Sequence, residues 1–373
     1  MVSLDQASGT MSQQTRLLQT DNASLHVAAA LLQAGQLVAI PTETVYGLGA
    51  DATSDQACAG IYTAKGRPSH NPLISHFPHA TAALAEARDH FPLRRLAEQL
   101  ARQFWPGPLT MVVPRHPQSN ICQRASAGLP TIAVRVPAPP ATRQLLALVG
   151  RPIAAPSANR SGRISPLCAQ DVQAELQGRL AAIVDGGPAP VGVESTIIDL
   201  SGDHPLLLRP GFITPADLEE ACATYGGLAH PAPAASASDK GTLTAPGQLT
   251  SHYAPTLPVV LGGQVNLQGT LEALLLFGPD EPDGLGVHAG LQGVDQQGRP
   301  WWNLSPKADR AQACSRLYAG LRWLDVEGRR LGCGLMRAPA LNVLDPDKTG
   351  LGLVLADRLR RAAAPRGTTP TSR

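Results

Sequence analysis

The chain has 373 residues, of which 43% are hydrophobic and 16% charged, and its formal net charge is +2 at pH 7. This composition is typical of a globular protein long enough for two domains, and it excludes a disordered chain and a general attraction to nucleic acid. No apolar run reaches the roughly 20 residues of a membrane helix, and the polar N-terminus lacks a signal-peptide pattern, so we expect a cytoplasmic protein with no membrane partner.

The six cysteines are scattered along the chain without a Cys-x-x-Cys pair, so we expect reduced, mostly buried thiols and neither disulfides nor a metal site. The sequence also lacks the G-x-x-x-x-G-K-[ST] loop, a G-x-G-x-x-G turn after a strand, the G-x-S-x-G elbow and the H-E-x-x-H motif. Their absence argues against the common nucleotide-binding motifs, serine hydrolases and zinc proteases.

Residues 1–20 are polar and show no periodicity, so we expect a loose tail. Apolar residues at helical spacing then predict a first helix that begins near Asn22 or Ser24 and ends at Gly35.

The segment from Ala39 to Phe77 carries the most informative pattern, and we expect it to form a strand, a turn, a helix, a loop and a second strand. Pro41 ends the first strand because it lacks a backbone donor. The polar residues 42–44 therefore fall at the C-terminal end of the strand, where ligands bind in open α/β sheets.

Gly47 and Gly49 predict a sharp turn, followed by a helix that Asp51, Thr53 or Ser54 would cap. The inner face of this helix would consist of apolar residues at helical spacing, namely Ala57, Ile61 and Ala64.

The end of this helix carries two cations, Lys65 and Arg67, followed by Pro68 and by Asn71. A Lys-x-Arg pair alone is usually a solvated helix end. Lys65, however, is the only lysine before Lys240, and two cations on a stiff loop suit the binding of a polyanion.

An arginine lies in the apolar strand predicted for residues 131–136, where Thr131, Ala133 and Arg135 share one face. Arg135 is either an edge-strand side chain that reaches solvent or a buried clamp for a carboxylate, because an unpaired buried charge is costly.

Small hydroxyl and amide residues after one strand form a cradle suited to a nucleotide or a phosphate, and two later strands carry polar residues at one end. Residues 156–162 follow a strand predicted for 152–155, and a helix is predicted from Ser165 to about Leu180. Glu194, Ser195 and Thr196 open the next strand, and Arg209 ends the strand after it. Taken singly, such clusters are usually plain turns.

Residues 226–257 are rich in Ala, Pro, Ser and Gly, which indicates a linker, and they end in His-Tyr-Ala-Pro. Apolar strands and helical patterns then alternate over 258–363, which predicts a second, smaller α/β domain with a largely parallel sheet and no catalytic constellation. We expect a frayed tail over 364–373.

Several motifs occur in an order that resembles the Sua5/YrdC/YciO family, specifically its long, Sua5-type L-threonylcarbamoyladenylate synthases. They are PTETVYGLG, KGRPSHNPL followed by a histidine, APSANRSG, GVESTIID and LLRPG, together with the linker ending HYAP. The resemblance implies an α/β fold with a YrdC-like twisted open mixed sheet flanked by helices over 21–225, and a C-terminal Rossmann-like Sua5 domain over 258–363.

The resemblance also implies a reaction. L-threonine, bicarbonate and ATP would give threonylcarbamoyl-AMP and pyrophosphate, with Mg²⁺ carried by ATP and no metal ligand from the protein. The product would pass to a tRNA threonylcarbamoyl transferase complex for the modification of position 37 in tRNAs that read ANN codons.

Site residues carry over by motif position. The threonine pocket would consist of Thr44, His76, Arg135, Ala155 and Ser195, and the ATP site of Lys65, Arg67, Asn71, Thr131, Ser157, Ser165, Arg209 and Tyr253. Lys65 and Arg67 would act electrostatically, because the reaction needs no protein nucleophile. Many relatives carry basic residues where this chain has Leu249 and Ser251, which puts a phosphate contact from the linker in doubt.

Two alternatives remain open from the residues. An RNA-binding module in tRNA or ribosome maturation would explain a basic concavity, but aromatic residues are only 4% of the chain, so we expect direct tRNA binding to be weak or absent. A carbamoyl-handling relative of hydrogenase maturation would share the fold, but the acylphosphatase and zinc-finger regions of such proteins are missing.

Overall fold

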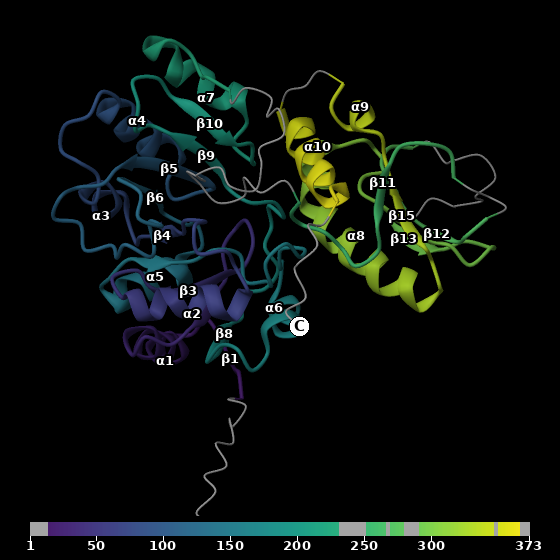
Figure 1. Cartoon of the computed structure of the whole chain (residues 1–373), viewed down its shortest axis with the longest axis horizontal. Helices are drawn as coiled ribbons and strands as arrows, with labels where there is room; N and C mark the ends of the chain where they lie inside the picture. The colour runs from purple at the N-terminus through teal and green to yellow at the C-terminus, as the bar shows by residue number, and fades with distance from the viewer. Residues whose placement is uncertain (1–13, 231–250, 266–268, 280–290, 347–349, 366–373) are drawn as a thin grey trace, which may run out of the picture.

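The computed structural model describes residues 14–230, 251–265, 269–279, 291–346 and 350–365. These residues form two sheets with flanking helices, which Figure 1 shows as two bodies side by side. This arrangement confirms the predicted α/β fold with a larger mixed sheet and a smaller C-terminal sheet. None of the helices in the described ranges is long and apolar enough to cross a membrane.

The larger sheet has ten strands in the order β1-β8-β2-β3-β7-β4-β6-β5-β9-β10. The strands are β1 (Arg16–Leu18), β2 (Val38–Ile40), β3 (Gly47–Asp51), β4 (Ile74–His76), β5 (Leu109–Pro114), β6 (Thr131–Arg135), β7 (Ile153–Ala154), β8 (Ala182–Val184), β9 (Thr196–Asp199) and β10 (Leu206–Arg209). The helices of this unit are α1 (Asn22–Gln33), α2 (Asp55–Lys65), α3 (Ala80–Ala85), α4 (Arg94–Phe104), α5 (Pro140–Val149), α6 (Ala169–Leu176), α7 (Pro215–Cys222) and the 3₁₀ turn η1 (Ala223–Tyr225).

Helices cover both faces of this sheet. Successive side chains of a strand point to opposite faces, and in β2 the central Ala39 joins a different hydrophobic cluster from Val38 and Ile40. The cluster of Val38 and Ile40 contains residues of α1 and α5, and the cluster of Ala39 contains residues of α2, α4 and α7.

The smaller sheet has five strands in the order β11-β15-β12-β14-β13, and only the β13–β14 pair is antiparallel. Its elements are β11 (Val259–Leu261), β12 (Glu272–Leu276), β13 (Gln292–Val294), β14 (Pro300–Asn303), α8 (Arg310–Arg330), β15 (Leu335–Ala338), α9 (Leu341–Leu344) and α10 (Gly350–Ala363). In Figure 1, α8 and α10 lie on the side of this unit that faces the larger sheet.

Local sequence signals explain the two helices that come first in the chain. Asp21 caps α1 by accepting a hydrogen bond from the Ser24 amide, and Ser54 caps α2 by accepting one from the Ala57 amide. Gly66 ends α2 in the left-handed conformation, with φ of 60°. The predicted starts of both helices are confirmed, α1 ends at Gln33 with Ala34 rather than Gly35 as its C-cap, and the predicted inner face of α2 is buried.

The turn predicted at Gly47 and Gly49 is wrong, because both residues lie in strand β3, which pairs antiparallel with β2. These glycines instead allow neighbouring strands to lie closer together than a side chain would permit. A Cβ atom at Gly49 would lie 2.9 Å from the Val38 carbonyl oxygen, and one at Gly47 would lie 3.1 Å from Ala155 Cβ.

Three other expectations need correction. Residues 16–18 of the predicted tail form strand β1, which pairs parallel with β8. The helix predicted from Ser165 begins at Ala169 and ends at Leu176, so Ser165 lies in the preceding loop. Strand β6, which carries Arg135, lies between β4 and β5, so Arg135 is not on an edge strand.

All six cysteines are free thiols, and four of them are buried, as expected. The predicted linker lies largely outside the described residues, which leave out 231–250.

The two units share one hydrophobic cluster. Val45, Ile164 and Val193 of the larger unit belong to the same cluster as Leu317 and Leu321 of α8. The C-terminal unit therefore packs directly against the loops that follow the strands of the larger sheet.

Candidate functional site

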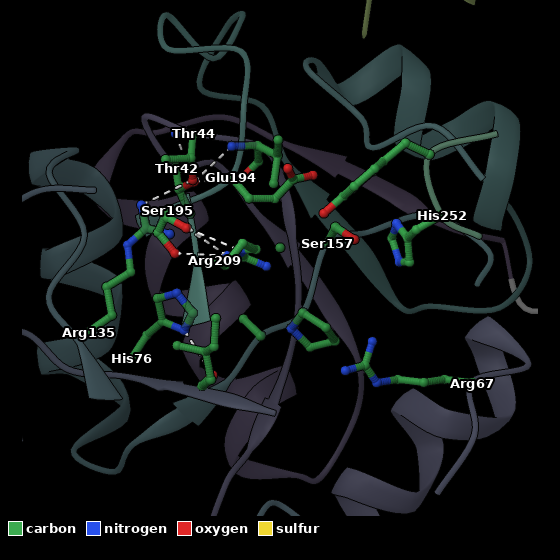
Figure 2. A pocket seen from close by; sticks show the side chains of 16 residues that line it. Thr42, Thr44, Arg67, His76, Arg135, Ser157, Glu194, Ser195, Arg209 and His252 are labelled. Carbon is green, nitrogen blue, oxygen red and sulfur yellow. Dashed lines mark hydrogen bonds between the residues drawn. The ribbon is translucent and has the colours of Figure 1, made fainter. Parts of the chain in front are cut away.

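A pocket lies where several loops and strand ends of the larger sheet meet the end of the linker. Sixteen residues line it: Thr42, Thr44, Val45, Gly47, Arg67, Ile74, His76, Arg135, Ala155, Pro156, Ser157, Glu194, Ser195, Arg209, His252 and Tyr253. In Figure 2, His76, Arg135 and Ser195 gather on one side of the pocket, and Arg67, Ser157 and His252 lie on the other. The structure thus brings together nine of the residues selected from the sequence.

Arg135 is buried and held by neighbours on one side of its guanidinium group. Its Nη2 donates to Glu43 Oε1 at 2.6 Å and to Thr44 Oγ1 at 3.0 Å, and its Nε donates to the Gly107 carbonyl at 3.3 Å. Within the described part of the chain, Nη1 has no recorded acceptor. Glu43, which was not among the site residues expected from the sequence, is the partner that offsets the cost of burying this charge.

His76 is a buried, neutral histidine. Burial, and then the nearby charge of Arg135, lower the pKa of His76 to about 3. Its Nδ1 lies 3.1 Å from the Ile74 carbonyl oxygen, which can only accept, so Nδ1 carries the proton of this bond.

Ser195 and Arg209 form a connected pair on the pocket wall. Arg209 donates through Nη2 to Ser195 Oγ at 3.1 Å and to the Ser195 carbonyl at 2.9 Å, and Ser195 Oγ lies 2.8 Å from Thr110 Oγ1. Arg67 is fixed by the carbonyls of Asn71 and Pro72, at 3.3 and 2.9 Å. Burial lowers the pKa of Arg67 to about 10, so its guanidinium still carries a positive charge at neutral pH.

Four residues selected from the sequence do not line the pocket. Lys65 is buried behind it, and its Nζ donates to the carbonyls of Ser157 and Asn159. Burial, and then the charge of Arg67, hold the pKa of Lys65 well below its usual range. Lys65 therefore supports the loop after β7, and its predicted contact with phosphates stays a prediction.

The other three differ in how they are placed. Asn71 is fully buried, and its side-chain amide has no recorded hydrogen-bond partner among the described residues. Thr131 lies at the opposite end of β6 from Arg135. Ser165 donates to Glu194 Oε1 at 2.6 Å, so it reaches the pocket only through Glu194.

Glu194 and His252 also line the pocket, although neither was among the site residues expected from the sequence. A charged residue inside the otherwise apolar and hydroxylic run around Glu194 was an available signal, as was the His-Tyr pair that ends the linker. The pKa of His252 is lowered to about 3, mainly because the side chain is buried. Leu249 lies outside the described residues, whereas Ser251 Oγ donates to the Ala364 carbonyl at 3.4 Å.

Comparisons with known proteins identify the family of the chain. A family described as "Telomere recombination" matches residues 30–211, and one described as "Threonylcarbamoyl-AMP synthase, C-terminal domain" matches residues 213–364. A threonylcarbamoyl-AMP synthase of Pyrococcus abyssi is 37% identical over 91% of this chain and 94% of its own length, and one of Bacillus subtilis is 38% identical over 94% and 95%.

The chain belongs to the Sua5-type threonylcarbamoyl-AMP synthases. A solved structure described as P. abyssi Sua5 complexed with L-threonine superposes on this synthase with a TM-score of 0.78 and 33% identity, covering 94% of this chain and 98% of that one. The family predicted from the motifs is confirmed. The synthase is an enzyme, so the alternative of an RNA-binding module is set aside as its function.

Proposed function

We propose that the pocket binds L-threonine beside Arg135 and ATP beside Arg67 and Arg209, and that bicarbonate joins them to give threonylcarbamoyl-AMP and pyrophosphate. The observation that carries the proposal is the convergence of three buried guanidinium groups on one pocket. Both proposed organic substrates are anionic at one end, and buried arginines bind such groups strongly.

For threonine, the proposal assigns the carboxylate to Arg135 and the amine and hydroxyl to Thr44, His76 and Ser195. The neutral state of His76 supports this assignment, because an uncharged imidazole does not repel the ammonium group. The methyl group of Ala155 gives the threonine side chain an apolar wall.

For ATP, the proposal assigns the phosphates to Arg67 and Arg209 and the remaining contacts to Ser157 and Tyr253. Asn71, with a buried amide that lacks a partner among the described residues, stays in the proposed ATP site, as do Thr131, Ser165 and Lys65. For these four, the proposal rests on the motif resemblance.

The chemistry requires no protein nucleophile. The amine of threonine adds to carbon dioxide with loss of a proton, or to bicarbonate with loss of water, to give a carbamate. A carbamate oxygen then attacks the α-phosphorus of ATP as the bond to pyrophosphate breaks. The arginines then stabilise the negative charge that gathers on phosphorus and on the departing pyrophosphate.

Mg²⁺ enters this proposal as part of the Mg-ATP substrate. Within the described residues, no group of three or more His, Cys, Asp or Glu side chains could hold a metal ion. The pocket carboxylate, Glu194, accepts bonds from Ser165, Tyr318 and Arg358. The donor set therefore suits a metal held by phosphate oxygens and water.

The proposal places the enzyme in the cytoplasm, where ATP and tRNA are available. The threonylcarbamoyl-AMP would be handed to a tRNA threonylcarbamoyl transferase complex for the modification of position 37 in tRNAs that read ANN codons.

The test is pyrophosphate release from ATP and bicarbonate, measured with and without L-threonine. We expect threonine-dependent release of pyrophosphate. Arg135→Ala should lower kcat/KM for threonine by about a hundredfold or more, because it removes the guanidinium group that pairs with the threonine carboxylate in the proposal. Arg102→Ala, on the exposed side of α4, is the matched control and should match the unsubstituted enzyme.

The proposal places ATP away from Arg135, so the Arg135→Ala variant should still bind ATP. A variant that has lost ATP binding as well would be misfolded rather than deprived of a threonine contact. No threonine-dependent release from the unsubstituted enzyme, over a range of Mg²⁺ and bicarbonate concentrations, would refute the proposal.

A further inference from the structure

Glu194 is a carboxylate on the wall of an otherwise cationic pocket, and three side chains donate hydrogen bonds to it. Ser165 Oγ donates to Oε1 at 2.6 Å, and Oε2 accepts from Tyr318 Oη at 2.7 Å and from Arg358 Nε at 2.9 Å. Glu194 is 6% exposed and Arg358 is fully buried, so their charges interact with little screening by water.

Two of these three donors come from the C-terminal unit. Tyr318 lies on α8 and Arg358 on α10, the two helices that face the larger sheet in Figure 1. The second domain, for which the sequence predicts no catalytic constellation, thus places a hydroxyl and a guanidinium next to the pocket.

Arg358 also fixes two neighbouring parts of the pocket. Its Nη2 donates at 2.9 Å to the carbonyl of Pro210, the residue that follows Arg209. Its guanidinium carbon lies 5.2 Å from the ring centre of Tyr253, and Tyr318 stacks on that ring at 5.5 Å. One buried side chain of α10 therefore contacts the carboxylate, the Arg209 segment and the end of the linker.

The charge of Glu194 matters because the proposed ATP phosphates carry the same sign. Burial alone would raise the pKa of Glu194, but the charges of Arg358 and Arg209 and the bonds from Ser165 and Tyr318 lower it to about 2. The carboxylate is thus ionised at neutral pH, and of the two arginines that offset its charge Arg358, which also pairs with Asp357, is the one that forms an ion pair with it.

We propose that Arg358 and Tyr318 are positioning residues of the synthase, through which the C-terminal unit neutralises and orients Glu194 on the wall that faces ATP. The inference rests on the proposed placement of ATP beside Arg67 and Arg209. It assigns to the second domain a part in nucleotide binding, beyond its packing against the first domain.

The two partners of the ion pair should then affect ATP binding in opposite directions. Arg358→Met leaves an unpaired carboxylate on the pocket wall, and we expect the Kd for ATP to rise by about tenfold or more. Glu194→Gln removes that carboxylate, while Arg358 keeps its ion pair with Asp357, so the repulsion of the phosphates is lost and the Kd for ATP should fall. Adding Glu194→Gln to Arg358→Met should reverse most of the rise.

Tyr318→Phe keeps the ring stacked on Tyr253 and removes only the hydroxyl, so it provides a test that does not depend on the folding of the Arg358 variant. We expect a smaller rise in the Kd for ATP, about threefold. Arg360→Met, an exposed arginine two residues from Arg358 on α10, is the matched control and should bind ATP like the unsubstituted enzyme.

The measurement is titration calorimetry with ATP and, separately, with L-threonine, whose Kd should change less than twofold in every variant. A purely structural ion pair predicts that breaking it from either side weakens ATP binding alike, and that result would overturn the inference. Equal losses of ATP and threonine affinity would overturn it as well.

Failure of the proposed function gives a different result. An unsubstituted enzyme that binds ATP but releases no pyrophosphate with threonine would contradict the proposed reaction. The opposite changes in the Kd for ATP of the Glu194→Gln and Arg358→Met variants would still test the inference. An unsubstituted enzyme that binds no ATP contradicts both.

Discussion

At the scale of single residues, the pocket holds two histidines that burial keeps uncharged, His76 and His252. The pKa of each is lowered to about 3 in the folded protein, against about 6.5 in an unfolded chain. Below pH 6.5 these histidines therefore bind protons in the unfolded chain but stay unprotonated in the folded protein. The stability that these neutral histidines contribute is complete above pH 6.5 and is lost as the pH falls toward 3.

Replacing His76 by glutamine should remove part of this pH dependence. We expect the free energy of unfolding of the His76→Gln variant to fall less steeply between pH 6 and pH 4, by up to about 1.4 kcal/mol per pH unit. Urea denaturation at several pH values measures the slope. His26→Gln, an exposed position on α1, is the control and should keep the original slope. An unchanged slope in the His76 variant would show that His76 already titrates normally.

The sequence could predict which of these residues meet only where each belonged to a recognisable motif. His76, Ser195 and Arg209 follow that pattern, and the structure places all three at the pocket. Glu194 lies in one of these motifs, but its contacts could not be predicted, because its partners Tyr318 and Arg358 lie 124 and 164 residues further along the chain. The expected phosphate contact of Lys65 depended on side-chain direction, which the motif does not specify.

At the scale of single elements, strand β3 shows how a glycine can be required without a turn. Gly49 has no positive φ, and it lies in a strand directly beside β2. The adjacent backbone leaves no space for a side chain, since a Cβ atom would lie 2.9 Å from the Val38 carbonyl oxygen and 3.1 Å from Ile153 Cγ2.

We expect Gly49→Ala to lower the free energy of unfolding by about 1 to 3 kcal/mol, because the added methyl group forces β2 and β3 apart. Urea denaturation gives the value. Gly202→Ala is the matched control, because a Cβ atom there would meet no atom within 4 Å and its φ is not positive. An equal loss of unfolding free energy in the two variants would mean that the close contact between β3 and β2 at Gly49 does not affect stability.

Elements with local signals could be predicted, and elements defined by distant pairing could not. The caps Asp21 and Ser54 and the left-handed Gly66 are such local signals, and α1 and α2 match their predictions. Gly47 and Gly49 have the spacing of a turn, and only the pairing of β3 with β2 and β7 shows that they form a strand. Strand β1 sits in a polar stretch whose partner, β8, is far along the chain.

At the scale of the whole molecule, the two units meet at a contact between backbones. Gly192 has φ of +78°, and a Cβ atom there would lie 2.5 Å from Ser315 Cα and 2.7 Å from the Cys314 carbonyl oxygen of α8. Helix α8 also carries Tyr318, so the distance between the units and the contacts of Glu194 are set together.

Gly192→Ala should therefore separate α8 from the larger unit. We expect it to lower the free energy of unfolding by about 2 kcal/mol more than Gly187→Ala does, and to weaken ATP binding. Gly187 is the matched control because its φ of +76° imposes the same backbone strain, while a Cβ atom there would meet no atom within 4 Å. Urea denaturation of both variants gives the difference. Equal free energies of unfolding would show that α8 can move away from Gly192 without loss of stability.

The pairing of β1 with β8 also has a consequence for the time at which the protein acquires its sheet. A ribosome must reach Val184 before β1 has a partner, and until then β2 lacks the neighbour that later covers one of its edges. An uncovered strand edge can pair with a strand of another nascent chain. Slow translation of the segment between β2 and β8 would therefore prolong this period, and chaperones that act at the ribosome would matter most during it.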